Sequence, residues 1–163
     1  MLKTLRILQY NANKSRNKVL IGLLQDPRTA SYDIIAIQEP WRNPFDYAAY
    51  NPRSSPFHLV DAKKEGSRVS MYVNKKLSLS TWQETQHTDD LQSVTLRITD
   101  EAQGPRIINI HNVYNPPPRS HNEKEELGTL AALPQASQMP GEHIFLGDFN
   151  LHHPLWAGPS YPH

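Results

Sequence analysis

Three segments of this chain end a run of apolar residues with a polar side chain that could hold a metal ion or a phosphate. The segments are residues 5–11 with Asn11 at the end, residues 33–39 with Glu39, and residues 143–146 followed by Gly147-Asp148-Phe149-Asn150. In an extended chain the side chains of Asp148 and Asn150 point the same way, because side chains alternate along a strand. A carboxylate beside an amide is suited to activating water and gripping phosphate.

Glu39 and Asn11 could form a magnesium site. Magnesium prefers oxygen ligands and keeps several waters, so one or two carboxylates and a substrate phosphate can hold it. Taken singly, Glu39 is more often a solvated loop carboxylate, and Asp-x-Asn after a strand is often an Asx turn. Their joint occurrence at strand ends favours a site, since catalytic groups gather on loops held by a rigid sheet.

Tyr114 ends a further apolar segment, residues 107–113. Its hydroxyl could reach a phosphate, or its ring could cap the core. His152, His153 and Trp156 follow the tetrapeptide closely. The histidines could bind a metal, shuttle protons or face solvent, and the indole could stack on a base or pack the loop.

An alternation of strands and helices must position these residues. Residues 5–11 and 33–38 are predicted strands that flank a helix over residues 14–25, which makes a βαβ unit with its polar ends at one rim. Further strands are predicted over residues 57–60, 68–73, 77–82, 91–99, 106–113 and 143–147, and a second helix over 122–132. The loop between residues 39 and 56 is rich in aromatic residues, Pro and Asn.

The composition narrows the class of protein. The 163 residues are enough for one domain. The net charge of +1 provides no overall positive field, so any attraction to phosphates must come from local Arg and Lys. The absence of Cys excludes disulfides, thiol catalysis and zinc–thiolate sites. Neither a signal peptide nor a membrane-spanning run is recognisable, so we expect a soluble intracellular protein that does not associate with membranes.

Together these residues resemble the endonuclease/exonuclease/phosphatase superfamily, which includes DNase I and the apurinic/apyrimidinic endonucleases. The matching positions are a first strand ending in Asn11 with Asn13 two residues on, a strand ending in Gln38-Glu39, a strand ending in Tyr114, and Gly-Asp-x-Asn with Asp148 and Asn150. The resemblance implies an α/β (α+β) fold, a four-layer α/β sandwich of the DNase I-like type with two mixed sheets flanked by helices. Within the superfamily, residues 38–41 and 147–156 are similar to the endonuclease domains of non-LTR retrotransposons.

The resemblance also implies an activity. It implies magnesium-dependent cleavage of a phosphodiester, with manganese as an alternative metal, that leaves a 3′-hydroxyl on nicked DNA. DNA would be the partner and the nucleus the expected location. Glu39 would bind the metal with Asn11 in its shell, Asp148 would align or deprotonate the water, and Asn150 and Tyr114 would hold the phosphate. The candidate substrate-binding residues are Asn13, Arg42, His152, His153 and Trp156.

Two departures from the family pattern qualify this prediction. Pro117 stands where the family commonly has Asn, and Asn115 is out of register. The family also continues past Gly-Asp-x-Asn to a terminal Asp-His pair, so residues 1–163 are expected to be the N-terminal two-thirds of one domain, incomplete at the C-terminus. The alternatives are an inactive remnant that binds nucleic acid weakly through scattered arginines, and a phosphatase on the same fold. The oligomeric state and the preferred DNA sequence stay open.

Overall fold

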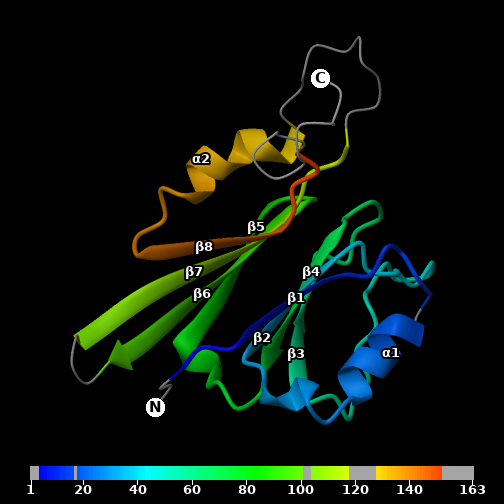
Figure 1. Ribbon diagram of the computed structural model, residues 1–163, viewed down its shortest axis with the longest axis horizontal. Helices are drawn as coiled ribbons and strands as arrows, with labels where there is room; N and C mark the ends of the chain where they lie inside the picture. The colour runs from blue at the N-terminus through cyan, green and yellow to red at the C-terminus, as the bar shows by residue number, and fades with distance from the viewer. Residues whose placement is uncertain (1–3, 17, 101–103, 118–127, 152–163) are drawn as a thin grey trace, which may run out of the picture.

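Two four-stranded sheets lie face to face in the computed structural model of this chain (Figure 1). The structure describes residues 4–16, 18–100, 104–117 and 128–151. The first sheet has the order β1 (Ile7–Asn11), β2 (Ile34–Gln38), β4 (Val69–Asn74), β3 (Phe57–Val60). The second has the order β5 (Trp82–Thr88), β6 (Leu91–Asp100), β7 (Gly104–Tyr114), β8 (Glu142–Asp148). Each sheet contains parallel and antiparallel pairs, so both are mixed as predicted.

The predicted βαβ unit opens the fold. Strands β1 and β2 pair in parallel with Asn11 opposite Gln38, and helix α1 (Lys18–Gln25) connects them. The helix begins later than the predicted residue 14, because Asn13 and Lys14 have φ angles of +48° and +50°. Left-handed backbone of this kind cannot continue into a right-handed helix.

Two other sequence-based predictions need correction. The strand expected over residues 77–82 is a short 3₁₀ helix, η2 (Leu79–Thr81), and the strand that follows is β5. Of the helix predicted over residues 122–132, residues 122–127 lie outside the described residues. The rest is the 3₁₀ helix η3 (Gly128–Ala132), which leads into α2 (Leu133–Ala136). One more 3₁₀ turn, η1 (Thr29–Ser31), follows α1.

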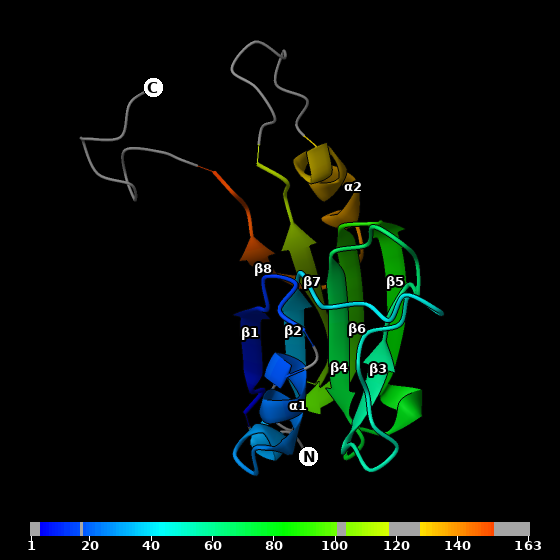
Figure 2. The same ribbon diagram turned by 90° about the vertical axis from the view of Figure 1, so that its right-hand side faces the viewer.

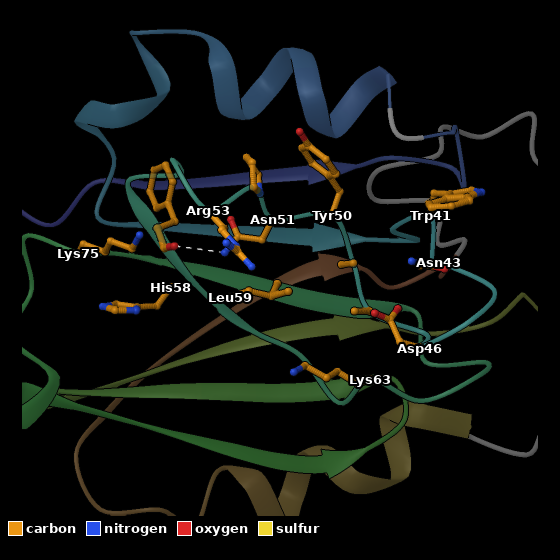
Figure 3. A pocket seen from close by; sticks show the side chains of 14 residues that line it. Trp41, Asn43, Asp46, Tyr50, Asn51, Arg53, His58, Leu59, Lys63 and Lys75 are labelled. Carbon is orange, nitrogen blue, oxygen red and sulfur yellow. Dashed lines mark hydrogen bonds between the residues drawn. The ribbon is translucent and has the colours of Figure 1, made fainter.

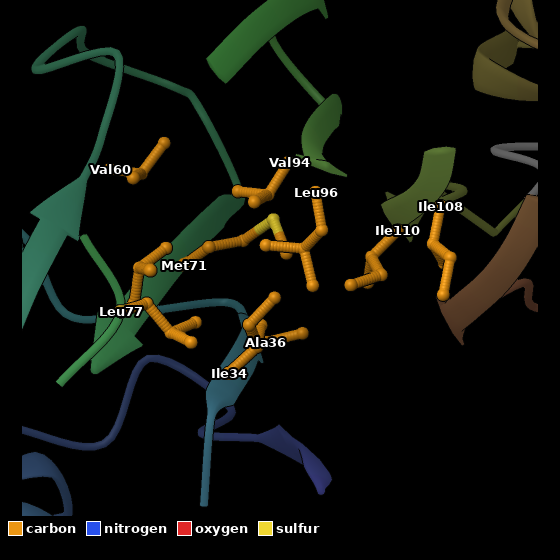
Figure 4. Close-up of a cluster of buried hydrophobic side chains, with 10 residues drawn as sticks. Ile34, Ala36, Val60, Met71, Leu77, Val94, Leu96, Ile108 and Ile110 are labelled. Atoms are coloured by element: carbon orange, nitrogen blue, oxygen red, sulfur yellow. The ribbon is translucent and has the colours of Figure 1, made fainter. Parts of the chain in front are cut away.

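Apolar side chains fill three layers of packing. Between the sheets lie residues that include Ile34, Met71, Leu96 and Ile110 (Figure 4). Outside the first sheet, Leu20 of α1 belongs to a second buried cluster with residues of β2, β3 and β4. Outside the second sheet, the α2 segment covers residues of β6 and β7. The order helix, sheet, sheet, helix is the predicted four-layer sandwich of the DNase I-like type.

The strands that carry the candidate residues end at the same rim. Figure 2 shows the arrowheads of β1, β2, β7 and β8 at one end of the sandwich. Within each sheet the two strands concerned run parallel. The polar residues at their carboxyl ends are therefore brought close together. None of the helices in the described ranges has the length and hydropathy needed to cross a membrane.

Candidate active site

The rim joins both sheets through a side-chain hydrogen bond. Asn11, at the end of β1, donates from Nδ2 to Oδ2 of Asp148, at the end of β8, over 2.8 Å. These residues are 137 positions apart in the chain. Asp148 also lies opposite Tyr114 in the parallel β7–β8 ladder. The structure thus brings Asn11, Tyr114 and Asp148 together, as expected from their positions at strand ends.

Glu39, directly after β2, completes the group. Tyr114 is only 6% exposed, and burial raises the pKa of its hydroxyl. A hydrogen bond with Glu39 and the negative charge of Glu39 raise this pKa further. Arg68 has the opposite effect on the pKa of Tyr114, and its guanidinium carbon lies 4.7 Å from the centroid of the ring. The phenol is therefore protonated at neutral pH and can donate a hydrogen bond.

Gly147 lets β8 approach β7 at the start of the tetrapeptide. Its φ angle is +143°, and a Cβ atom added there would lie 1.9 Å from the carbonyl oxygen of Val113. Only glycine fits this close approach of two backbones. The glycine of Gly-Asp-x-Asn is thus required for the placement of Asp148.

Asn150 and Asn115 hold the tetrapeptide in shape. The Asn150 backbone N–H donates to Oδ1 of Asp148 over 3.2 Å, and its Nδ2 donates to the carbonyl of Asn115 over 2.6 Å. Asn115 in turn donates its backbone N–H to the carbonyl of Asp148 over 2.7 Å. Asn115, which the sequence pattern left out of register, is therefore part of the site. An amide nitrogen carries two N–H groups, so the Asn150 side chain keeps a second donor beyond its bond to Asn115.

Backbone strain is concentrated at the rim. The φ angles of Asn13, Glu39 and Asn150 are +48°, +48° and +44°. Such conformations cost about 1–3 kcal/mol each in residues other than glycine, and they cluster at functional sites. Asn13 lies at the rim but contributes its backbone, since its N–H donates to Oδ1 of Asn11 over 2.8 Å.

Arg42, a predicted substrate-binding residue, has a structural role instead. Its guanidinium donates to the carbonyls of Ser67, Tyr47 and Val69, to the Ser67 hydroxyl and to the Asp61 carboxylate, over 2.6–3.1 Å. These contacts engage all five N–H donors of an arginine. The Asp61 side chain is fully buried in this pair. Arg42 pins the loop after Glu39 and has no donor left for a phosphate.

Arg68 is a rim residue that the sequence offered only as one of several scattered arginines, not as a site residue. It pairs with Asp90 in a bidentate contact, from Nε over 3.1 Å and from Nη2 over 2.6 Å, and stacks on Tyr114. The backbone N–H of Tyr114 donates to the Asp90 carbonyl over 2.9 Å. No local pattern marks Arg68, because its place depends on how β4 packs against the second sheet. The remaining predicted residues, His152, His153 and Trp156, lie outside the described residues.

The donor set fits a hard divalent cation. Glu39 and Asp148 supply carboxylates and Asn11 an amide oxygen, and neither carboxylate has an ion pair with another described side chain. Within the described ranges there is no group of three or more His, Cys, Asp or Glu side chains of the kind that encloses a metal. Magnesium accepts so few protein ligands, because water and substrate phosphate complete its shell.

Residues 8–162 match the sequence profile of the Endonuclease/Exonuclease/phosphatase family, and the chain belongs to this family. All three activities in that description hydrolyse phosphate esters, and the family generally depends on divalent metals. The family is thus one of metal-dependent phosphoesterases. A comparison with curated protein sequences gives no match.

Three solved structures are similar to this chain. The catalytic domain of Xenopus laevis APE2 superposes with a TM-score of 0.59 at 17% identity, over 93% of this chain and 60% of that domain. The human Nocturnin catalytic domain with bound sulfate gives 0.49 at 16% identity, over 94% and 66% of the two chains. ANGEL2, a 2′,3′-cyclic phosphatase, gives 0.47 at 16%, over 90% and 52%. At these identities the APE2 likeness establishes the fold alone, and this chain spans 60% of the APE2 domain.

Proposed function

We propose that this chain hydrolyses a phosphodiester bond of DNA in a magnesium-dependent reaction, with manganese able to substitute. The observation that supports this most is the 2.8 Å hydrogen bond from Asn11 to Asp148, which joins the strand ends of both sheets beside Tyr114. The family membership of residues 8–162 supplies the class of reaction.

Each rim residue has a task in this proposal. Glu39 and the amide oxygen of Asn11 hold the metal, which supplies charge stabilisation at the phosphate when bound. Asp148, held by the Asn11 amide, orients a water and accepts its proton. The second N–H of Asn150 donates a hydrogen bond to a phosphate oxygen, where negative charge grows during the attack. The single O–H of Tyr114, which bonds Glu39 in the structure, turns to another phosphate oxygen once Glu39 holds the metal.

The bond changes follow from this arrangement. The water oxygen forms a bond to phosphorus, and the bond from phosphorus to the 3′ oxygen breaks. The products are a 5′-phosphate and a 3′-hydroxyl, after the released oxygen takes up a proton from solvent. A nick of this kind can prime DNA synthesis, as expected of a retrotransposon endonuclease, and nuclear action is part of the same proposal.

Nicking of supercoiled plasmid tests this function. We expect relaxation with magnesium, none with chelator, and a loss of at least 100-fold in Glu39→Gln and Asp148→Asn, because each change removes a charge that the reaction needs. Glu84→Gln, an exposed carboxylate on β5, is the matched control and should nick at the wild-type rate. Circular dichroism and urea unfolding would show whether each variant folds.

Two results would overturn the proposal. One is nicking that persists in chelator or in folded Asp148→Asn. The other is a folded wild-type chain that leaves plasmid intact but hydrolyses a phosphomonoester such as p-nitrophenyl phosphate, which would favour the phosphatase alternative.

A further inference from the structure

A groove runs along the edge strand β3, outside the strand-end rim (Figure 3). Its volume is about 590 Å³. Residues of β3 line it together with the loop that follows Glu39, and Trp41, two residues after that carboxylate, stands at one end. The loop that lines the groove therefore begins directly after the proposed metal ligand Glu39.

The groove gathers positive charge. Arg53, Lys63 and Lys75 line it, against the single carboxylate of Asp46. All three cations are exposed, although the whole chain has a net charge of only +1. The groove thus has a local excess of cations that the overall composition conceals.

The three groove cations have no acidic partner in the part of the chain that the structure describes. Ion pairs neutralise Arg28, Lys64, Lys76 and Arg106 elsewhere. Among the described residues, no carboxylate pairs with Arg53 or Lys63. Lys75 donates to the backbone carbonyl of Ser55 over 2.6 Å and keeps its charge without a carboxylate partner in the described ranges. Unpaired cations along a groove are suited to a polyanion.

Two flat aromatic surfaces accompany the charges. Trp41 and Tyr50 both line the groove and are half-buried. A base stacked on such a ring contributes about 1–3 kcal/mol to binding. Stacking requires an unpaired base, so aromatic rings with cations favour a single strand over a duplex.

The wall of the groove is fixed before any ligand binds. The Tyr72 hydroxyl donates to the carbonyl of Tyr50 over 2.5 Å, and the Ala49 N–H donates to Asp61 over 2.8 Å. Asp61 is in turn paired with Arg42. A wall tied in this way loses little conformational entropy on binding.

We propose that this groove binds a single-stranded segment of nucleic acid that flanks the cleaved phosphodiester. Arg53 and Lys63 bind its phosphates, and Trp41 stacks on one of its bases. The inference rests on the proposed function for the location of the cleaved bond, because Trp41 follows the metal ligand Glu39.

Equilibrium binding in chelator separates this inference from catalysis. The probes are a blunt DNA duplex and the same duplex with a six-nucleotide single-stranded extension at the 5′ or the 3′ side. We expect the wild type to bind one of the extended duplexes about 10-fold or more tighter than the blunt duplex. The double variant Arg53→Ala/Lys63→Ala should lose this gain in affinity. The slope of log K against log salt should fall by about 1.4 for two lost single-strand contacts. Trp41→Ala should lose at least 5-fold on the extended probe alone.

Lys64→Ala/Lys76→Ala is the matched control, since it removes the same charge from ion-paired lysines outside the groove. It should reduce binding of the extended probe by less than 2-fold. The inference is overturned if the groove variant and the control variant lose the same affinity for the extended probe. It is also overturned if the groove variant loses the same affinity for blunt and extended probes, or if polyglutamate competes for binding as well as single-stranded DNA does.

The two proposals can fail separately. If the wild type does not nick plasmid but the groove variants lose the extension-dependent affinity, the groove stands and the nuclease proposal falls. If the wild type nicks plasmid and the groove variants bind the extended probe normally, the groove proposal falls alone.

Discussion

At the scale of single residues, the site depends on side chains whose environment suits them to one task. Tyr114 is buried beside Glu39. Its burial and its interaction with Glu39 both raise the pKa of the phenol above its ordinary value of 10.0. A phenol is neutral below its pKa. The hydrogen bond that it donates is therefore present throughout pH 6–9 and is lost only above pH 10.

Tyr114→Phe tests this role. We expect the nicking rate to fall about 10–100-fold, which corresponds to about 1.4–2.7 kcal/mol of transition-state stabilisation, while the affinity for DNA changes little. In the wild type, kcat/KM between pH 6 and 10 should show no alkaline decline caused by the phenol. A decline below pH 10 that disappears in Tyr114→Phe would contradict the assignment.

Arg42 shows the limit of residue type as a guide. Arg42 follows Glu39 by three residues. An arginine so close to the proposed site suggests phosphate binding, because guanidinium groups recognise phosphate well. In the structure the carbonyls of Ser67, Tyr47 and Val69 share its donors with Asp61. Only the path of the loop decides between these roles, and that path is a tertiary property.

At the scale of elements, β7 has two buried asparagines that face opposite sides of its sheet. Asn112 points between the sheets, where it accepts from Gln38 over 2.5 Å and donates to the carbonyls of Ile37 and Ser70, each over 3.0 Å. Asn109 instead accepts from Thr95 within its own sheet over 2.8 Å. Asn112 therefore connects β7 to β2 directly beneath the rim, and it positions Glu39 relative to Tyr114.

Asn112→Leu and Asn109→Leu form a matched pair. Each leaves buried polar partners unsatisfied, so we expect each to lower the free energy of unfolding by about 1–3 kcal/mol. Only Asn112→Leu should also raise the magnesium concentration needed for half-maximal nicking, by several-fold, because it loosens Glu39. Urea unfolding and magnesium titration of the nicking rate measure the two effects. An equal magnesium requirement in both variants would show that Asn112 is only structural.

Most of the elements could be predicted from local sequence patterns. The apolar run of β2 and the alternation in β6 were visible, and the predicted strand over residues 57–60 coincides with β3. The missed strand, β5, reads Trp-Gln-Glu-Thr-Gln-His-Thr and is partly exposed. An edge strand with a polar surface lacks the apolar alternation by which strands are recognised, so only its pairing with β6 identifies it.

At the scale of the whole molecule, a chain of hydrogen bonds crosses the second sheet. His143 donates from Nε2 to the carbonyl of Met139 over 2.9 Å, and in the tautomer with hydrogen only on Nε2 its Nδ1 accepts from Nε2 of His111, also over 2.9 Å. Nδ1 of His111 then accepts from the Ser93 hydroxyl over 2.6 Å, and Ser93 accepts from His87 over 2.7 Å. These hydrogen bonds connect all four strands with the turn after α2.

Acid should therefore destabilise the fold. Burial, with the neighbouring His143 and His87, lowers the pKa of His111 to about 4 from 6.5. The unfolded state takes up the proton more readily than the folded state. The contribution of neutral His111 to the free energy of unfolding is therefore full above pH 6.5 and is lost as the pH falls towards 4. Its size is roughly 1–3 kcal/mol. Urea unfolding between pH 4 and 8 measures it.

His111→Gln supplies the comparison for this effect. It should be less stable at pH 8 but show a flatter dependence on pH. His58→Gln, on β3 in the other sheet, should keep the wild-type dependence. Equal slopes for the wild type and His111→Gln would contradict the interpretation.

The sequence by itself predicted the kind of chemistry and determined the local geometry that would serve it. Asn11, Glu39, Tyr114 and Asp148 each end or follow a strand. Such features depend on short-range sterics and side-chain alternation, which a sequence pattern records. The tertiary structure alone decided that Asn11 holds Asp148 across 137 residues, that Asn115 and Arg68 belong to the rim, and that Arg42 does not. These contacts arise from the packing of one sheet on the other, and nothing in the local sequence specifies which distant side chains that packing brings together.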